Sequence, residues 1–169
     1  MEDLGVAPSF ELTSADGTPF SSQTLAGRVW VMDFIFTRCA GPCPRMSSQM
    51  KALQKAFADE PGVHFVSVSV DPVADSPPVL RAYAQKYEAN PERWTFLTGG
   101  VVPIYDLIEK GFHLGAGPPP DPEKVGPGDL IIHSTRFILV DKAGTIRGTF
   151  LSEDPGFQEA VTQAIRRLL

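Results

Sequence analysis

The chain has 169 residues, a formal net charge of −5 and a pI near 5.1, which argues against nucleic acid or an anionic membrane surface as its main partner. Its length favours a single domain, residues 1–169. No apolar run approaches the roughly 20 residues that a membrane-spanning helix needs.

The first predicted elements are a small N-terminal β-hairpin, residues 8–13 and 19–22, and then a strand. That strand is the apolar run 29–36, which is interrupted only by Asp33. It has the length and composition of a strand buried on both faces. Apolar side chains at helical spacing then predict a helix at about residues 43–59.

Strands and helices continue to alternate in the second half of the chain. The valine-rich run 63–70 predicts a strand parallel to the first, because a helix connects the two. The remaining predicted elements are a helix at about 77–88, a strand at 94–98, a helix at 101–110, a hairpin of 135–141 and 145–151, and a last helix with an apolar stripe from 157 to 168. Residues 115–129 contain five prolines and four glycines, which predicts a long surface loop. This order predicts an α/β thioredoxin-like fold, a central mixed β-sheet flanked by helices, with an added N-terminal hairpin.

Two cysteines, Cys39 and Cys43, stand between the apolar strand and the following helix. If residues 39–43 form the first helical turn, the two side chains share a face, with Cβ atoms about 5–6 Å apart. That spacing suits either a disulfide or the binding of one metal ion. The positive end of the helix dipole would also favour thiolates, which are both nucleophiles and metal ligands. Passive buried cysteines are disfavoured because Gly41-Pro42 between them matches a thioredoxin-like redox turn.

Two carboxylates are further candidates for the site. Asp33 lies six residues before Cys39, the offset at which thioredoxins carry a buried carboxylate that accepts the proton of the resolving thiol. The alternative is a peripheral side chain. Asp71 ends the second parallel strand at the same sheet edge as Cys39, and such edges carry the sites of α/β sheets. It would either bond near a metal or cap a turn with Pro72.

Four short segments follow one another in a specific order and spacing along nearly the whole chain. They are FIFTRC with Cys43-Pro44, SVDP with DSP at residues 69–77, WTFLTG at 94–99, and His133-Ser134 ahead of FILVD at 137–141. In these segments the chain resembles the Sco/SenC family of copper-binding, thioredoxin-fold proteins that help to assemble cytochrome c oxidase.

The resemblance implies that Cys39, Cys43 and His133 are copper ligands. The side-chain chemistry agrees, because two soft thiolates select Cu(I) and one imidazole also accommodates Cu(II). Thioredoxins carry a cis-proline at about the place where Ser134 stands here. A polar pair containing histidine opens a coordination position there, which a disulfide exchanger would not need.

The chain departs from the family pattern at two positions. Ala40 stands where a proline usually follows the first cysteine, and Ile132 stands where an acidic residue usually precedes the histidine. An acidic neighbour would orient the imidazole, and the loss of such a group typically lowers metal affinity by about 10–100-fold.

Two functions compete on these residues. The first is a metallochaperone that binds one copper ion through Cys39, Cys43 and His133 and passes it to a partner. The second is a thiol–disulfide oxidoreductase in which Cys39 reacts, Cys43 resolves and His133 only tunes a pKa. A peroxiredoxin-type peroxidase is disfavoured because the cysteines are too close in sequence, and a redox-regulated binding module remains open. We favour copper, with metal loading restricted to the reduced thiols.

The resemblance also carries expectations about location and partners. It implies an extracytoplasmic domain, in the bacterial periplasm or on the outer face of the cytoplasmic membrane, tethered by an N-terminal helix. The expected partner is the copper-receiving subunit of cytochrome c oxidase or another copper or thiol protein, with the domain itself a monomer. Residues 1–5 lack the basic and apolar regions of a signal peptide, which taken literally predicts a cytosolic chain. A domain cut from behind an anchor would look the same.

Overall fold

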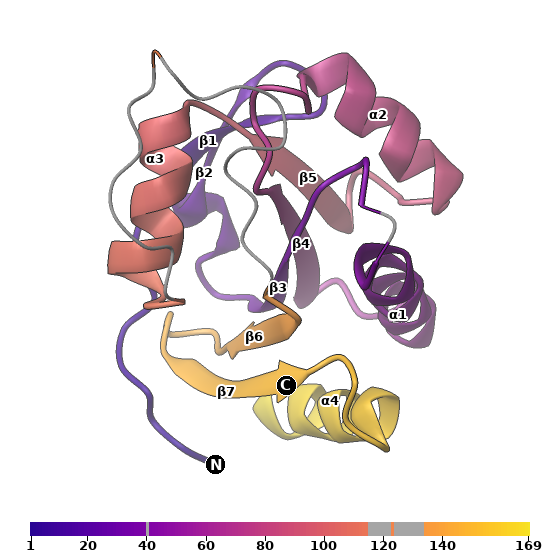
Figure 1. The fold of residues 1–169 in the computed structure, drawn as a ribbon. Coiled ribbons are helices and arrows are strands. Elements are labelled where there is room, and N and C mark those ends of the chain that lie inside the picture. Colours follow the sequence, from indigo (N-terminus) through magenta and orange to yellow (C-terminus); the bar gives the residue numbers. More distant parts are fainter. Residues whose placement is uncertain (40, 115–122, 124–133) are drawn as a thin grey trace.

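The computed structural model describes residues 1–39, 41–114, 123 and 134–169 (Figure 1). The predicted Pro/Gly-rich loop at 115–129 therefore lies outside the described residues, apart from position 123. Within the described part, seven strands form one mixed sheet in the order β2-β1-β5-β4-β3-β6-β7. The strands are β1 (Glu11–Ser14), β2 (Pro19–Ser21), β3 (Val29–Ile35), β4 (Val63–Ser69), β5 (Trp94–Thr98), β6 (Arg136–Val140) and β7 (Ile146–Leu151).

The centre of the sheet is parallel and its margins are antiparallel. Strands β3, β4 and β5 run parallel to one another, so their carboxyl ends meet at one edge of the sheet. The β1–β2 hairpin pairs antiparallel with β5, and β6 pairs antiparallel with β3. Because of that antiparallel pairing, β6 begins at the edge where β3 ends. We call this edge the cysteine edge, since Cys39 follows β3 directly.

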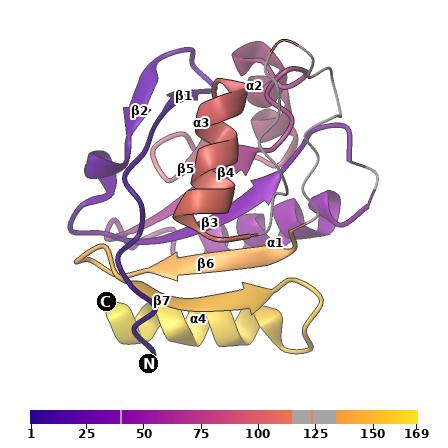
Figure 2. The same cartoon turned by 60° about the vertical axis from the view of Figure 1, so that its left-hand side comes forward.

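Helices cover both faces of the sheet (Figures 1 and 2). The helical elements are a 3₁₀ turn (Ser22–Leu25), α1 (Cys43–Ala56), α2 (Pro77–Lys86), α3 (Val101–Asp106), a π-helical turn (Leu107–Gly111) and α4 (Phe157–Leu168). Every residue of β3 is buried, as the apolar run predicts, because alternate side chains enter different cores. Val31 belongs to the core that also holds α1, α2 and α4 residues, whereas Met32 belongs to the core formed with α3.

The predicted start of the helix at residue 43 is confirmed, but the helical turn considered before it is absent, and the helix at 101–110 ends differently from the prediction. α1 begins at Cys43, so the assumption that residues 39–43 form the first helical turn is wrong. Pro42 accounts for this start, because a proline disfavours helical dihedrals at the residue before it, Gly41. The predicted helix at 101–110 ends in the π-helical turn, where the Phe112 N–H donates to the Leu107 carbonyl at 2.9 Å.

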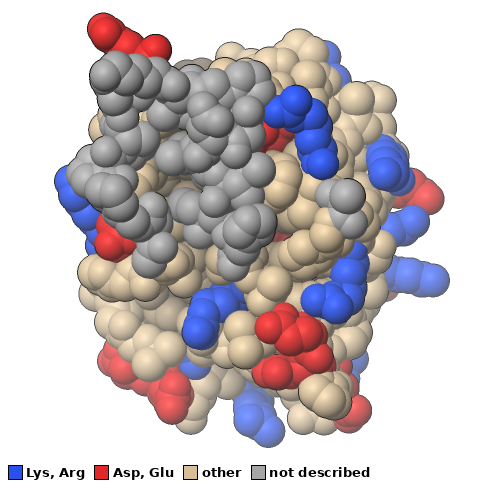
Figure 3. Space-filling view, in the orientation of Figure 1, with Lys and Arg blue, Asp and Glu red and all other residues tan. Residues whose placement is uncertain are grey.

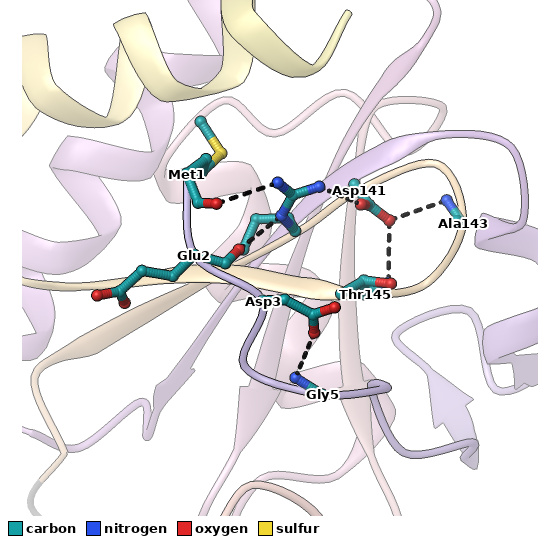
Figure 4. A network of polar contacts seen from close by, with 8 residues as sticks. Met1, Glu2, Asp3, Gly5, Asp141, Ala143 and Thr145 are labelled. Atoms are coloured by element: carbon teal, nitrogen blue, oxygen red, sulfur yellow. Dashed lines mark hydrogen bonds and ion pairs between the residues drawn. The ribbon is translucent and has the colours of Figure 1, made fainter.

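The first residues of the chain are fixed to the β6–β7 hairpin (Figure 4). Arg147 donates from Nε to the Glu2 carbonyl at 2.7 Å and from Nη1 to Asp141 Oδ2 at 3.0 Å. The Leu4 N–H also donates to the Ile146 carbonyl at 2.9 Å. Since β6 ends opposite the start of β3, this contact lies at the end of the sheet away from the cysteine edge.

None of the helices in the described ranges has both the length and the apolarity needed to cross a bilayer.

Candidate metal centre

The structure brings the two cysteines together at the cysteine edge. Cys39 is half-buried and its N–H donates to the Phe36 carbonyl at 3.2 Å, which closes a turn directly after β3. Cys43 is buried as the first residue of α1. Both are free thiols, and Cys39 contributes to the raised pKa of Cys43, so the two side chains are neighbours. Two neighbouring thiols suit a disulfide or the binding of one soft ion.

Burial decides the protonation of Cys43. Desolvation, followed by the hydrogen bond with Cys39, raises the pKa of the Cys43 thiol to about 12, and a hydrogen bond with the Phe36 backbone offsets only part of this. The expectation that the start of the helix favours a thiolate is therefore wrong for Cys43, because desolvation outweighs the helix dipole. A metal that binds this sulfur must displace its proton.

Asp33 lies in the middle of β3 and is fully buried, which rules out the peripheral alternative. Ser67, opposite it on β4, donates to Oδ1 at 2.5 Å, and the Trp94 indole N–H donates to Ser67 Oγ at 3.0 Å. Oδ2 is buried without a hydrogen-bond partner among the described residues. Burial raises the pKa of Asp33 to about 7, only partly offset by Ser67. The charge of Asp33 also contributes to the raised pKa of Cys43, which links the two groups.

Asp71 lies at the cysteine edge with its carboxylate paired to an arginine. Its side chain is 2% exposed, and Arg38 Nη2 lies 3.4 Å from its Oδ2. Its carbonyl accepts hydrogen bonds from the N–H groups of Ala74 and Asp75, so its backbone also closes a turn. The space-filling view in Figure 3 shows both basic and acidic side chains on the described part of the surface. The Asp71 backbone therefore closes a turn and its carboxylate pairs with the residue before Cys39, and both expectations for the side chain stay predictions.

Sequence reasoning missed a network of three residues beside the cysteines. Asp75 accepts hydrogen bonds from Thr37 N at 3.1 Å, Thr37 Oγ1 at 2.5 Å and Ser69 Oγ at 2.7 Å. Asp75 and Ser69 are fully buried. The one available signal was a second aspartate four residues after Asp71, directly before the Ser76-Pro77 helix start.

The third sequence-predicted ligand, His133, lies outside the described residues, as do Ala40 and Ile132. Across the described ranges, no group of three His, Cys, Asp or Glu side chains is arranged to hold a metal ion. The two adjacent thiols alone form a soft donor pair that fits Cu(I). A site that adds a third side chain of these types to the pair requires a donor from outside the described residues.

The SCO1/SenC family model matches residues 2–169. The chain belongs to the SCO1/SenC family. It is 35% identical over 139 residues to a SCO1 protein homolog from Bacillus subtilis, covering 81% of this chain and 69% of that protein. It is 32% identical to a protein from Stutzerimonas stutzeri named a putative copper-binding protein, covering 83% of this chain and 67% of that one.

Solved structures of the SCO1/SenC family share the fold. A family lipoprotein from Bacillus anthracis superimposes with a TM-score of 0.83 at 33% identity, covering 99% of this chain and 97% of that one. BsSco, described as having a disulfide switch and as a member of the Sco family of cytochrome c oxidase assembly proteins, gives a TM-score of 0.79 at 31% identity, covering 99% and 95%. The resemblance and the thioredoxin-like α/β fold inferred from the sequence are both confirmed.

Proposed function

We propose that this SCO1/SenC chain is a copper metallochaperone, which binds one copper ion through the thiolates of Cys39 and Cys43 and the imidazole of His133. The bound copper serves the assembly of the copper site of cytochrome c oxidase. The observation that carries the proposal is the pair of free, neighbouring thiols at the cysteine edge. The names of relatives, a putative copper-binding protein and a cytochrome c oxidase assembly protein, support the same reading.

Strand topology supports His133 as the third ligand. β6 runs antiparallel to β3, so Arg136, its first residue, starts at the edge where β3 leads to Cys39. His133 precedes Arg136 by three positions in the sequence. One imidazole added to two thiolates makes a donor set that serves both Cu(I) and Cu(II).

Proton transfer is the second part of the proposal. With a pKa of about 12, the Cys43 thiol carries its proton at neutral pH and releases it when copper binds. Asp33, with a pKa of about 7 and an unpaired buried oxygen among the described contacts, is the proposed acceptor of that proton. Copper loading then strengthens as pH rises.

The proposal includes a location and a partner. The domain works outside the cytoplasm on a membrane tether, as a monomer, and delivers copper to the copper-receiving subunit of the oxidase or to another copper or thiol protein. Support for the location comes from the Bacillus anthracis relative, which is described as a lipoprotein.

The test is a copper titration of the reduced protein, with Cu(I) and separately with Cu(II). An intense sulfur-to-copper absorption band with Cu(II), and a melting temperature that rises with bound metal by mass action, are expected for the native chain. Both effects should be weaker in His133→Ala. The matched control is His113→Ala, which changes an exposed histidine directly after the buried Phe112 and should leave the band intact. Equal bands in both variants would remove His133 from the site, and no band in the native chain would remove copper.

One observation favours a second function, thiol–disulfide exchange. A buried carboxylate with one bare oxygen, coupled to the buried thiol, suits a proton acceptor for a resolving cysteine. If the native chain bound no copper but its reduced Cys39/Cys43 dithiol reduced protein disulfides catalytically, ending each cycle as a Cys39–Cys43 disulfide that glutathione reduces again, the oxidoreductase would replace the metallochaperone.

A further inference from the structure

The turn that carries Cys39 is anchored through Thr37, two residues earlier. Both polar groups of Thr37 reach the same carboxylate: its N–H donates to Asp75 Oδ2 at 3.1 Å and its hydroxyl donates to Oδ1 at 2.5 Å. Asp75 lies 38 residues further along the chain, in the loop between β4 and α2. The turn after β3 is therefore held from a different part of the fold.

Asp75 is itself rigidly held. It is fully buried, and Ser69 Oγ at the end of β4 donates to its Oδ2 at 2.7 Å. The same Ser69 oxygen accepts the Asp71 N–H at 3.1 Å, and the Asp75 N–H donates to the Asp71 carbonyl at 2.9 Å. One carboxylate thus joins the end of β3, the end of β4 and the approach to α2. Hydrogen bonds to a buried carboxylate are among the stronger ones in proteins.

The two cysteines differ in what holds them in place. Cys43 belongs to α1 and is 4% exposed within the core, so the helix fixes its position. Cys39 stands in a turn, half-buried, with a backbone hydrogen bond to Phe36. The distance between the two sulfurs therefore depends on where the Thr37–Cys39 segment is held.

We propose that Asp75 is a positioning residue for the cysteine pair. By fixing Thr37, it keeps Cys39 within bonding reach of Cys43, which favours a disulfide or a shared metal ion over separate thiols. The inference rests on the proposed function only in taking the cysteine pair as the working group, and the chemistry of disulfide formation tests it without any copper.

The measurable consequence is the equilibrium between the dithiol and the disulfide in a glutathione buffer. Cys39 and Cys43 together lose two electrons and two protons as their S–S bond forms, and one glutathione disulfide gains both to give two glutathione thiols. A well-positioned pair has a high effective concentration of one thiol at the other, which favours the protein disulfide. A turn that is released from Asp75 lowers that effective concentration.

Three variants test this step. Thr37→Val is nearly isosteric and removes the hydroxyl donor, Thr37→Ser retains a hydroxyl, and Asp75→Asn removes one of the two acceptor oxygens. Because hydrogen bonds to a carboxylate are among the stronger ones and part of their free energy holds the turn in place, the disulfide equilibrium constant should fall about tenfold in Asp75→Asn and about threefold to fivefold in Thr37→Val. Thr37→Ser should stay close to the native value.

The matched control is Thr95→Val. It removes the hydrogen bond between Thr95 Oγ1 and His64 Nε2, 2.7 Å long, beside the first residues of β3 and far from the cysteine edge. It should lower the melting temperature without changing the disulfide equilibrium. If Asp75→Asn does not fold, the two Thr37 variants decide the question.

Native values of the equilibrium constant in Thr37→Val and in any folded Asp75→Asn would overturn the positioning role, as would an equal fall in Thr95→Val. Failure of the native chain to bind copper would instead overturn the proposed function and leave this measurement as it stands.

Discussion

Asp33 and Asp75 are both fully buried, yet their surroundings differ. The Asp75 carboxylate, at the cysteine edge, accepts three hydrogen bonds from Thr37 and Ser69. The Asp33 carboxylate, in the middle of β3, accepts one side-chain hydrogen bond from Ser67 and leaves Oδ2 bare among the described residues. Burial without full pairing raises the pKa of Asp33 to about 7.

The difference shows how one residue type serves two purposes in one core. A carboxylate whose oxygens are all paired fixes the geometry of the segments that bond to it. A carboxylate with an unpaired oxygen in a dry site responds to protons at neutral pH, because its charged form is poorly stabilised. Asp75 therefore belongs to the positioning of the cysteines, and Asp33 to their proton chemistry.

The largest expected effect that distinguishes them is on stability. Asp75→Ala should lower the free energy of unfolding by about 3–5 kcal/mol, because it leaves several buried donors without an acceptor. Asp33→Asn should lower the free energy of unfolding by no more than about 1 kcal/mol at pH 7. One side-chain donor, Ser67, bonds to Asp33, and the substitution replaces a carboxyl that is about half protonated at this pH by a neutral amide. Urea unfolding of both variants measures this. Equal losses of unfolding free energy in the two variants would contradict the claim that Asp75 is fully paired and Asp33 is not.

The next effect is the pH dependence of stability. The folded Asp33 carboxyl has a pKa of about 7, whereas an unperturbed aspartate has a pKa of 3.8, so the folded state binds more protons than the unfolded state between these pH values. The stabilising contribution is complete below pH 3.8 and is lost as pH rises through about 7, with a slope of up to about 1.4 kcal/mol per pH unit. Asp33→Asn should flatten this slope in urea unfolding series from pH 4 to pH 8. A slope that is unchanged in the variant would contradict the raised pKa.

Two buried serines of β4 give a smaller, matched contrast. Ser67→Ala removes the donor to Asp33. Because the Ser67 hydrogen bond lowers the Asp33 pKa, the pH at which stability is lost should move about one pH unit higher in this variant. Ser69→Ala removes a donor to Asp75 and leaves Ser67 in place, so it should lower stability by about 1–2 kcal/mol without moving the part of the profile that belongs to Asp33. The same unfolding series measures both. A shifted profile in Ser69→Ala alone would reverse the roles assigned to the two aspartates.

The smallest effect is expected at Arg38. Its side chain is 58% exposed and its nitrogen lies 3.4 Å from Asp71, so Arg38→Ala should change the free energy of unfolding by about 1 kcal/mol or less. Thermal unfolding at low and at 0.5 M salt checks this, because screening should reduce the difference further. A loss as large as that of Asp75→Ala would mean that Arg38 holds the turn as firmly as Asp75 does.

Local patterns in the sequence were enough for most of the fold. The apolar run at 29–36 predicted a strand buried on both faces, and β3 is buried throughout. The strand at 94–98 has the predicted bounds because Gly99-Gly100 ends it. The start of α1 at Cys43 was predicted, whereas the helical turn considered at 39–43 is absent, because helical spacing does not register how Pro42 acts on the residue before it.

The candidate site was predictable only where its signal was local or came from the family resemblance. Cys39 and Cys43 stand out by spacing, and the burial of Asp33 follows from its apolar neighbours. The pKa of Asp33 depends on its desolvation and on Ser67, which faces it from another strand. The Thr37–Asp75 contact joins residues 38 positions apart, which no helical or strand periodicity reveals.

The most direct test of the copper site is X-ray absorption at the copper edge on the reduced, Cu(I)-loaded protein. The account predicts a copper shell with two sulfur ligands and one imidazole nitrogen, and loss of the imidazole contribution in His133→Ala with both sulfurs retained. A shell of nitrogen and oxygen alone, or a spectrum that His133→Ala leaves unchanged, would contradict it.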